Sequence, residues 1–64
     1  MVKINGRETD AEGKTLMEYL KETEYPLRRI AVECNGEIVP KTSYETKVIC
    51  DGDKIEIVSF VGGG

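Results

Sequence analysis

The residues that point most clearly to a chemical reaction are the last three of the sequence, Gly62, Gly63 and Gly64. Glycine has no Cβ and loses more conformational entropy on folding than any other residue, so such a run is not expected to pack. A segment without side chains can also enter a slot that is too narrow for substituted residues. We therefore expect a flexible tail over residues 62–64, with the unhindered α-carboxylate of Gly64 as its reactive group.

Chemistry at a carboxylate requires activation, because a carboxylate is a poor electrophile. Its mixed anhydride with AMP has a good leaving group, which a thiolate or persulfide can displace. The glycine cluster is not followed by Lys-Ser/Thr or by a helix, so it is not a phosphate-binding loop. We therefore expect a separate enzyme to use ATP on Gly64. The chain would be its protein substrate, with no catalytic residue and no cofactor of its own. The alternative is that the three glycines are an inert or engineered end.

Composition narrows the function classes further. The 64 residues include 9 Lys and Arg, 12 Asp and Glu and no His, for a net charge of −3. An acidic chain without a basic cluster is a poor nucleic-acid binder, because phosphate affinity depends on paired cations. Without His, and with only Cys34 and Cys50 as soft ligands, no metal site is expected. Substrate pockets of about 300–1,000 Å³ are large for so small a core, which disfavours a self-contained enzyme.

The sequence also indicates where the protein works. No apolar run approaches the roughly 20 residues that a membrane span requires, and residues 1–5 lack the apolar stretch of a signal peptide. We therefore expect a cytoplasmic protein that contacts no membrane and whose cysteines stay reduced. Cys34 and Cys50 are interpreted as small buried hydrophobes, since neither has a neighbouring His or cationic cluster that would activate a sulfur nucleophile.

The first half of the chain predicts a hairpin and a helix. Residues 2–4 alternate apolar and polar as a half-buried strand does, and Asn5-Gly6 suits a tight turn before a short, exposed strand over residues 7–12. Residues 15–18 form a capping-box sequence in which Thr15 and Glu18 satisfy each other's backbone N–H groups. The helix is predicted to run for about two turns, with Leu16, Tyr19 and Leu20 on one face, and to be closed by Tyr25-Pro26.

The second half predicts three further strands. Residues 30–34 alternate as a strand, Asn35-Gly36 is a second turn, and residues 38–39 form a short edge strand stopped by Pro40. A polar loop over residues 41–47 is anchored by Tyr44, and a turn at residues 51–53 precedes the longest β-branched run, residues 55–61. With this last strand parallel to the first, the chain is an α+β roll of the β-grasp (ubiquitin-like) type. It would have four to five strands in a mixed sheet and one short helix on one face.

The end of the last predicted strand carries apolar residues on both faces. Val58 and Phe60 lie on the face opposite Ile55 and Ile57, where they are either partly covered or exposed as a patch. An exposed patch beside the tail, continued by Val61, would be where partner enzymes dock. A bulge of one residue would exchange the faces, so the sequence leaves both interpretations open.

Several segments, taken in order, resemble one known family. They are Val32, Asn35, residues 38–41 (Ile-Val-Pro-Lys), Tyr44, residues 51–53 (Asp-Gly-Asp), Ile55, Ile57 and residues 60–64 (Phe-Val-Gly-Gly-Gly). The chain resembles the ThiS family of sulfur carriers of thiamine biosynthesis over its whole length, and most distinctively after residue 31. Lys41 and Tyr44 depart from the family, in which arginine and tryptophan are common at these positions.

The resemblance implies a β-grasp domain over residues 1–61 and a defined chemical role. A ThiF-type enzyme would adenylate Gly64 with ATP while Gly62, Gly63 and Gly64 occupy its active site. A sulfur donor such as a cysteine desulfurase would then supply the sulfur of a thiocarboxylate, which thiazole synthase (ThiG) would use. A MoaD-like carrier for molybdopterin or another sulfur pathway is the nearest alternative. A β-grasp binding module with no chemistry at its end is the alternative from another class.

Overall fold

The last strand of the chain lies at the centre of the sheet. A computed structural model describes residues 1–60, and Val61 and residues 62–64 lie outside the description. The strands are β1 (Val2–Ile4), β2 (Arg7–Thr9), β3 (Ile30–Cys34), β4 (Glu37–Val39) and β5 (Lys54–Ser59). They form one sheet in the order β2-β1-β5-β3-β4, with β5 parallel to β1 and antiparallel to β3. The predicted β-grasp arrangement is confirmed, with five strands.

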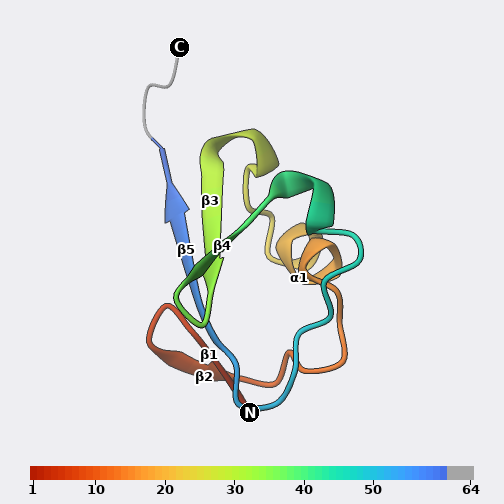
Figure 1. The fold of residues 1–64 in the computed structure, drawn as a ribbon, viewed down its shortest axis with the longest axis vertical. Helices are drawn as coiled ribbons and strands as arrows, with labels where there is room; N and C mark the ends of the chain where they lie inside the picture. The colour runs from red at the N-terminus through yellow and green to blue at the C-terminus, as the bar shows by residue number, and fades with distance from the viewer. Residues whose placement is uncertain (61–64) are drawn as a thin grey trace.

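One face of this sheet is closed by the helix α1 (Leu16–Glu22), which lies across it (Figure 1). Two single turns of 3₁₀ helix, η1 (Leu27–Arg29) and η2 (Lys41–Ser43), lie in the connections on either side of β3 and β4. The side chains between helix and sheet form one buried cluster: Val2, Ile4, Ala11, Leu16, Leu20, Ile30, Val32, Cys34, Val39, Tyr44, Ile49, Ile55 and Ile57. Tyr44 anchors the loop after β4 as predicted, and its carbonyl also accepts the Met17 N–H at 2.9 Å.

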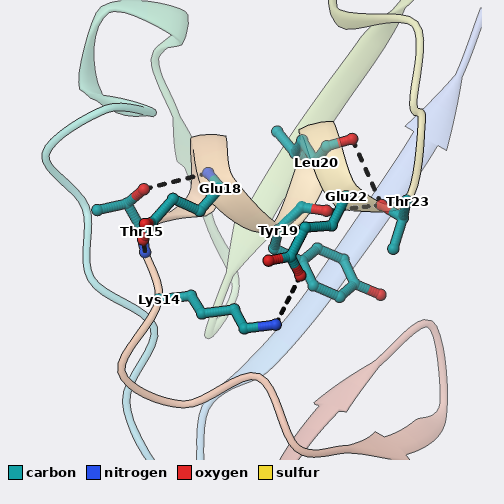
Figure 2. A network of polar contacts seen from close by, with 7 residues as sticks. All are labelled: Lys14, Thr15, Glu18, Tyr19, Leu20, Glu22 and Thr23. Carbon is teal, nitrogen blue, oxygen red and sulfur yellow. Dashed lines mark hydrogen bonds and ion pairs between the residues drawn. The ribbon is translucent and has the colours of Figure 1, made fainter.

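The start of α1 is fixed by the predicted capping box. The Thr15 hydroxyl accepts the Glu18 N–H at 3.1 Å, and the Glu18 carboxylate accepts the Thr15 N–H at 2.8 Å (Figure 2). Capping in this way satisfies N–H groups that have no partner within the helix. Leu16 and Leu20 then point into the core.

The seven residues of α1 confirm the predicted length of about two turns, but the residues that close the helix differ from the prediction. The helix stops at Glu22 instead of continuing to Tyr25-Pro26, because the backbone turns left-handed at Glu24 (φ 60°). The Thr23 hydroxyl donates to the Tyr19 carbonyl at 2.8 Å and helps to close the last turn (Figure 2). Pro26 prevents the helix from continuing past Tyr25, but the helix already ends three residues earlier, at Glu22.

The strand boundaries also differ in detail. The strand predicted over residues 7–12 ends at Thr9, because the chain leaves the sheet to place Ala11 in the core. The last strand begins at Lys54, one residue earlier than predicted, and ends at Ser59. No helix within residues 1–60 is long and apolar enough to cross a membrane.

Candidate functional site

The sheet face that α1 does not cover carries exposed apolar side chains. The side chains of Val58, Phe60 and Ile38 are 54%, 51% and 67% exposed. Val58 lies opposite Ala31 across the β3–β5 pair, and Ile38 lies opposite Glu33 across the β3–β4 pair. Because alternate residues of a strand share a face, these positions lie on one side of the sheet, which we call the open face.

The structure shows which face of the sheet Val58 and Phe60 lie on. Ile55 and Ile57 are buried under α1, and Val58 points the other way, as the alternation predicted. Phe60 keeps this alternation because its N–H donates to the Arg29 carbonyl at 2.6 Å, one step beyond the Ile30–Ser59 pair. Both side chains are about half exposed, so apolar area at this end of the sheet is open to solvent, and its use for docking stays a prediction. Val61, the third predicted docking residue, lies outside the described residues.

Ile38 was not predicted as a site residue. It follows from the position of Val39, which is buried on β4: neighbouring residues of a strand face opposite sides, so Ile38 must face away from the core. The sequence contains this signal in the Ile-Val pair, but reading it requires knowing which of the two is buried.

Charges divide the open face into zones. Lys3 lies opposite both Glu8 and Lys54, so the half that is formed by β1, β2 and the start of β5 carries mixed charge. Glu33 lies directly opposite Glu56 and next to Ile38. This pair separates the mixed charges around Lys3 from the apolar end of the open face, which consists of Val58 and Phe60. Like charges in such a pair repel each other, so a cationic group placed against them would relieve the repulsion. The apolar end of the open face is therefore bordered by negative charge.

The glycines on which the chemistry depends lie outside the described residues. Phe60, the last described residue, follows directly after β5 and comes two positions before Gly62. The predictions that residues 62–64 are flexible, that they enter a partner's active site and that Gly64 is modified therefore stay predictions. The structure adds that the strand which leads to these glycines is central and is paired on both sides.

The two cysteines have different environments. Cys34 is 5% exposed at the end of β3, and burial, followed by the nearby Asp53 carboxylate, raises the pKa of its thiol. Such a thiol is a weak nucleophile at neutral pH, in agreement with the predicted structural role. The same prediction for Cys50 is wrong, because Cys50 is exposed. The segment before it forms only an isolated bridge between Thr15 and Val48, with Ile49 turned inward and Cys50 outward.

Within residues 1–60, no group of three or more Cys, Asp or Glu side chains could hold a metal ion.

Residues 2–64 match the model of the ThiS family. The chain belongs to the ThiS family. The sulfur carrier protein ThiS of Bacillus subtilis is 36% identical over the whole of both chains. The sulfur carrier protein ThiS of Thermus thermophilus is 38% identical, also over the whole of both chains.

Thiazole synthase of Paramagnetospirillum magneticum is 48% identical over 95% of this chain, but the match spans only 19% of that much longer protein. Among solved structures, the thiamine biosynthesis protein ThiS of Geobacter metallireducens has a TM-score of 0.80 and 27% sequence identity. The match covers 98% of this chain and 97% of that one. ThiS family membership therefore agrees with the observed fold and with the resemblance in the sequence.

Proposed function

We propose that the chain is a sulfur carrier protein whose Gly64 carboxylate is activated, converted to a thiocarboxylate and used for thiazole formation in thiamine biosynthesis. The observation that carries this proposal is the ThiS family match, which extends through the glycines to residue 64. The two full-length carriers that match over both entire chains support the same role.

In the proposed reaction, a ThiF-type enzyme first joins the Gly64 carboxylate to the AMP part of ATP and releases pyrophosphate. Sulfide, supplied by a donor such as a cysteine desulfurase whose persulfide is reduced by a thiol, then bonds to the acyl carbon and displaces AMP, which leaves a thiocarboxylate. The carrier contributes the acyl group and no catalytic residue. Gly62 and Gly63 contribute the narrow backbone that lets the Gly64 acyl carbon reach the partner's reacting groups.

The open face is the proposed docking surface for these partners. Val58 and Phe60 are half exposed at the end of the strand that leads to Gly64, and Ile38 adds apolar area on the same face. The facing carboxylates of Glu33 and Glu56 suit a partner surface that sets a lysine or arginine beside an apolar contact. Val61, the third predicted docking residue, lies outside the described residues and stays a prediction.

Thiazole synthase is proposed as the protein that accepts the sulfur. Two thiazole synthases contain a region similar to this chain, at 48% and 36% identity, which accounts for 19% and 20% of their length. A carrier-like region joined to a thiazole synthase in one polypeptide supports a direct contact between the two activities. It also favours the thiamine pathway over the MoaD-like alternative. The predicted cytoplasmic location suits soluble partners of this kind and stays a proposal.

Intact-mass measurement tests the proposal directly. The protein is incubated with ATP, a ThiF-type enzyme and a sulfide source, and we expect a species in which one oxygen is replaced by sulfur. A variant that lacks Gly64 is the control and should show neither the mass change nor carrier-dependent pyrophosphate release. If an enzyme that modifies another ThiS carrier leaves this chain unmodified, the proposal is wrong. Transfer of sulfur to a molybdopterin precursor, with none to thiazole synthase, would favour the MoaD-like alternative.

A further inference from the structure

The pairing between β1 and β5 ends before β5 does. The two strands are paired at Lys3↔Lys54 and Ile4↔Ile55. The Asn5 N–H still donates to the Ile55 carbonyl at 2.9 Å, but at Asn5 the backbone turns into the hairpin with a positive φ of 50°. On the side of β5 that faces β1, Ile57 therefore has no β1 residue paired with it.

The Asn5 side chain takes the place of the missing strand residue. The Ile57 N–H donates to Asn5 Oδ1 at 2.7 Å, and Asn5 Nδ2 donates to the Ile57 carbonyl at 3.2 Å. In a regular parallel ladder, the Ile57 N–H would donate to the main-chain carbonyl of Asn5. An asparagine amide offers an acceptor and a donor together, whereas an aspartate carboxylate offers only acceptors. Asn5 thus extends the hydrogen bonding of β5 up to the residue before Val58.

We propose that Asn5 is a positioning residue for partner docking, because it holds the end of β5 so that Val58 and Phe60 are presented in a fixed geometry. This inference rests on the proposed function, in which partners bind the open face. Without the two side-chain bonds, Ile57 loses its partners on the β1 side. A partner must then order this part of the strand as it binds, which weakens binding.

The chain contains a matched control at the other end of β5. Asn35 is also the first residue of an Asn-Gly turn, and its φ is 54°. Its Oδ1 accepts the Lys54 N–H at 2.9 Å, and its Nδ2 donates to the Asp53 carboxylate at 3.1 Å. Asn35 therefore also holds the backbone of β5 through its side-chain oxygen, at the end remote from Val58, while its amide group bonds the Asp53 carboxylate just before the strand.

The test compares Asn5→Asp with Asn35→Asp in steady-state adenylation by a ThiF-type enzyme, with the carrier as the varied substrate. Each change keeps the side-chain size and removes the Nδ2 donor. We expect Asn5→Asp to raise KM about tenfold with little change in kcat, because a strand-end hydrogen bond is replaced by a carboxylate facing a carbonyl. Asn35→Asp should leave KM nearly unchanged even where it lowers the unfolding temperature equally. Equal increases in KM for both variants, or none for Asn5→Asp, would overturn the inference.

Amide hydrogen exchange separates this inference from the proposed function. Asn5→Gly, which removes both side-chain bonds, should speed exchange at the Ile57 N–H and spare Lys54, and Asn35→Gly should do the reverse. Unchanged exchange at Ile57 overturns the positioning role whatever the partner does. If the wild-type protein is not adenylated, the proposed function is wrong. The exchange pattern still tests whether Asn5 holds the end of β5. If either aspartate variant fails to fold, Asn5→Gly and Asn35→Gly replace the pair, since glycine also accepts positive φ.

Discussion

The two faces of the sheet differ sharply although the same strands build them. On the covered face, Ile55 and Ile57 are almost fully buried under α1, whereas Val58, on the same strand, is more than half exposed. The open face pairs Glu33 with Glu56 and leaves Ile38 in solvent. The covered face supplies the burial that stabilises the fold. The open face is therefore available for binding a partner, and changes there can be expected to affect binding more than stability.

The largest effect is expected on the covered face. Leu20→Ala removes a side chain with no exposed area from the contact between α1 and the sheet. The change should lower the free energy of unfolding by about 2–5 kcal/mol, through lost burial and the cavity left behind. Urea denaturation followed by circular dichroism measures it. Ile38→Ala on the open face is the control, with an expected change of about 0.5 kcal/mol or less. Equal losses for the two variants would contradict the division between the faces.

The next effect is expected on the open face and concerns binding. The double change Val58→Asp with Phe60→Ala should weaken binding to a ThiF-type enzyme at least about tenfold, because exposed apolar anchors at an interface contribute most of the affinity. The free energy of unfolding should change by only about 0.5 kcal/mol. Isothermal titration calorimetry gives the dissociation constant. Unchanged affinity in a folded variant would show that partners dock elsewhere.

A smaller effect is expected where the covering helix begins. Thr15→Ala removes the acceptor for the Glu18 N–H and breaks the capping box. The expected loss of stability is about 1 kcal/mol, which is typical for an N-cap threonine. Thermal unfolding measures it, with Thr42→Ala in the exposed η2 turn as the control. Affinity for partners should not change, because the cap lies on the other side of the molecule from the open face. A loss of affinity in the folded variant would contradict this separation.

The smallest effect is expected at the base of β5 and depends on pH. Desolvation raises the pKa of Asp53, but hydrogen bonds from the Cys50 N–H and the Asn35 side chain lower it more, so the pKa lies below its ordinary value. A folded-state pKa below the unfolded value of about 3.9 means that the stabilisation is complete above that pH. It is lost as the pH falls through the folded-state pKa.

Asp53→Asn should therefore reduce the fall in stability between about pH 5 and pH 2, and should leave the shape of the curve near neutral pH unchanged. Denaturation midpoints over this pH range measure the effect. An unaltered acid limb in the variant would show that other carboxylates account for the whole dependence. Asp10→Asn, at an exposed position, is the control.

Local patterns in the sequence predicted most of the fold. Alternation placed Ile30, Val32 and Cys34 inward, the Asn-Gly pairs marked both hairpins, and the long β-branched run became the central strand. These features depend on neighbouring residues and can therefore be predicted from short windows. The central position of β5 further required the parallel pairing with β1, which was inferred from the order of the elements.

The missed features depend on contacts between distant segments. The end of α1 is set by a left-handed residue at Glu24 and not by the later proline. The role of Asn5 depends on a partner 52 positions away, and nothing in the Asn-Gly pattern distinguishes a simple turn from one that also holds another strand. The exposure of Ile38 depends on which residue of its pair faces the helix. For the same reason, the sequence could identify Val58 and Phe60 as candidates but could not decide whether they were covered.

The parallel pairing of β1 with β5 has a mechanical consequence. The first and last strands lie side by side and run in the same direction, and β3 holds β5 from its other side (Figure 1). A pull on the chain beyond residue 60, against an anchored N-terminus, loads these hydrogen bonds in shear and at the same time, instead of peeling them one by one. In the proposed reaction, an enzyme that holds the end of the chain pulls on a strand that is hydrogen-bonded on both sides, so the body resists the pull as a unit.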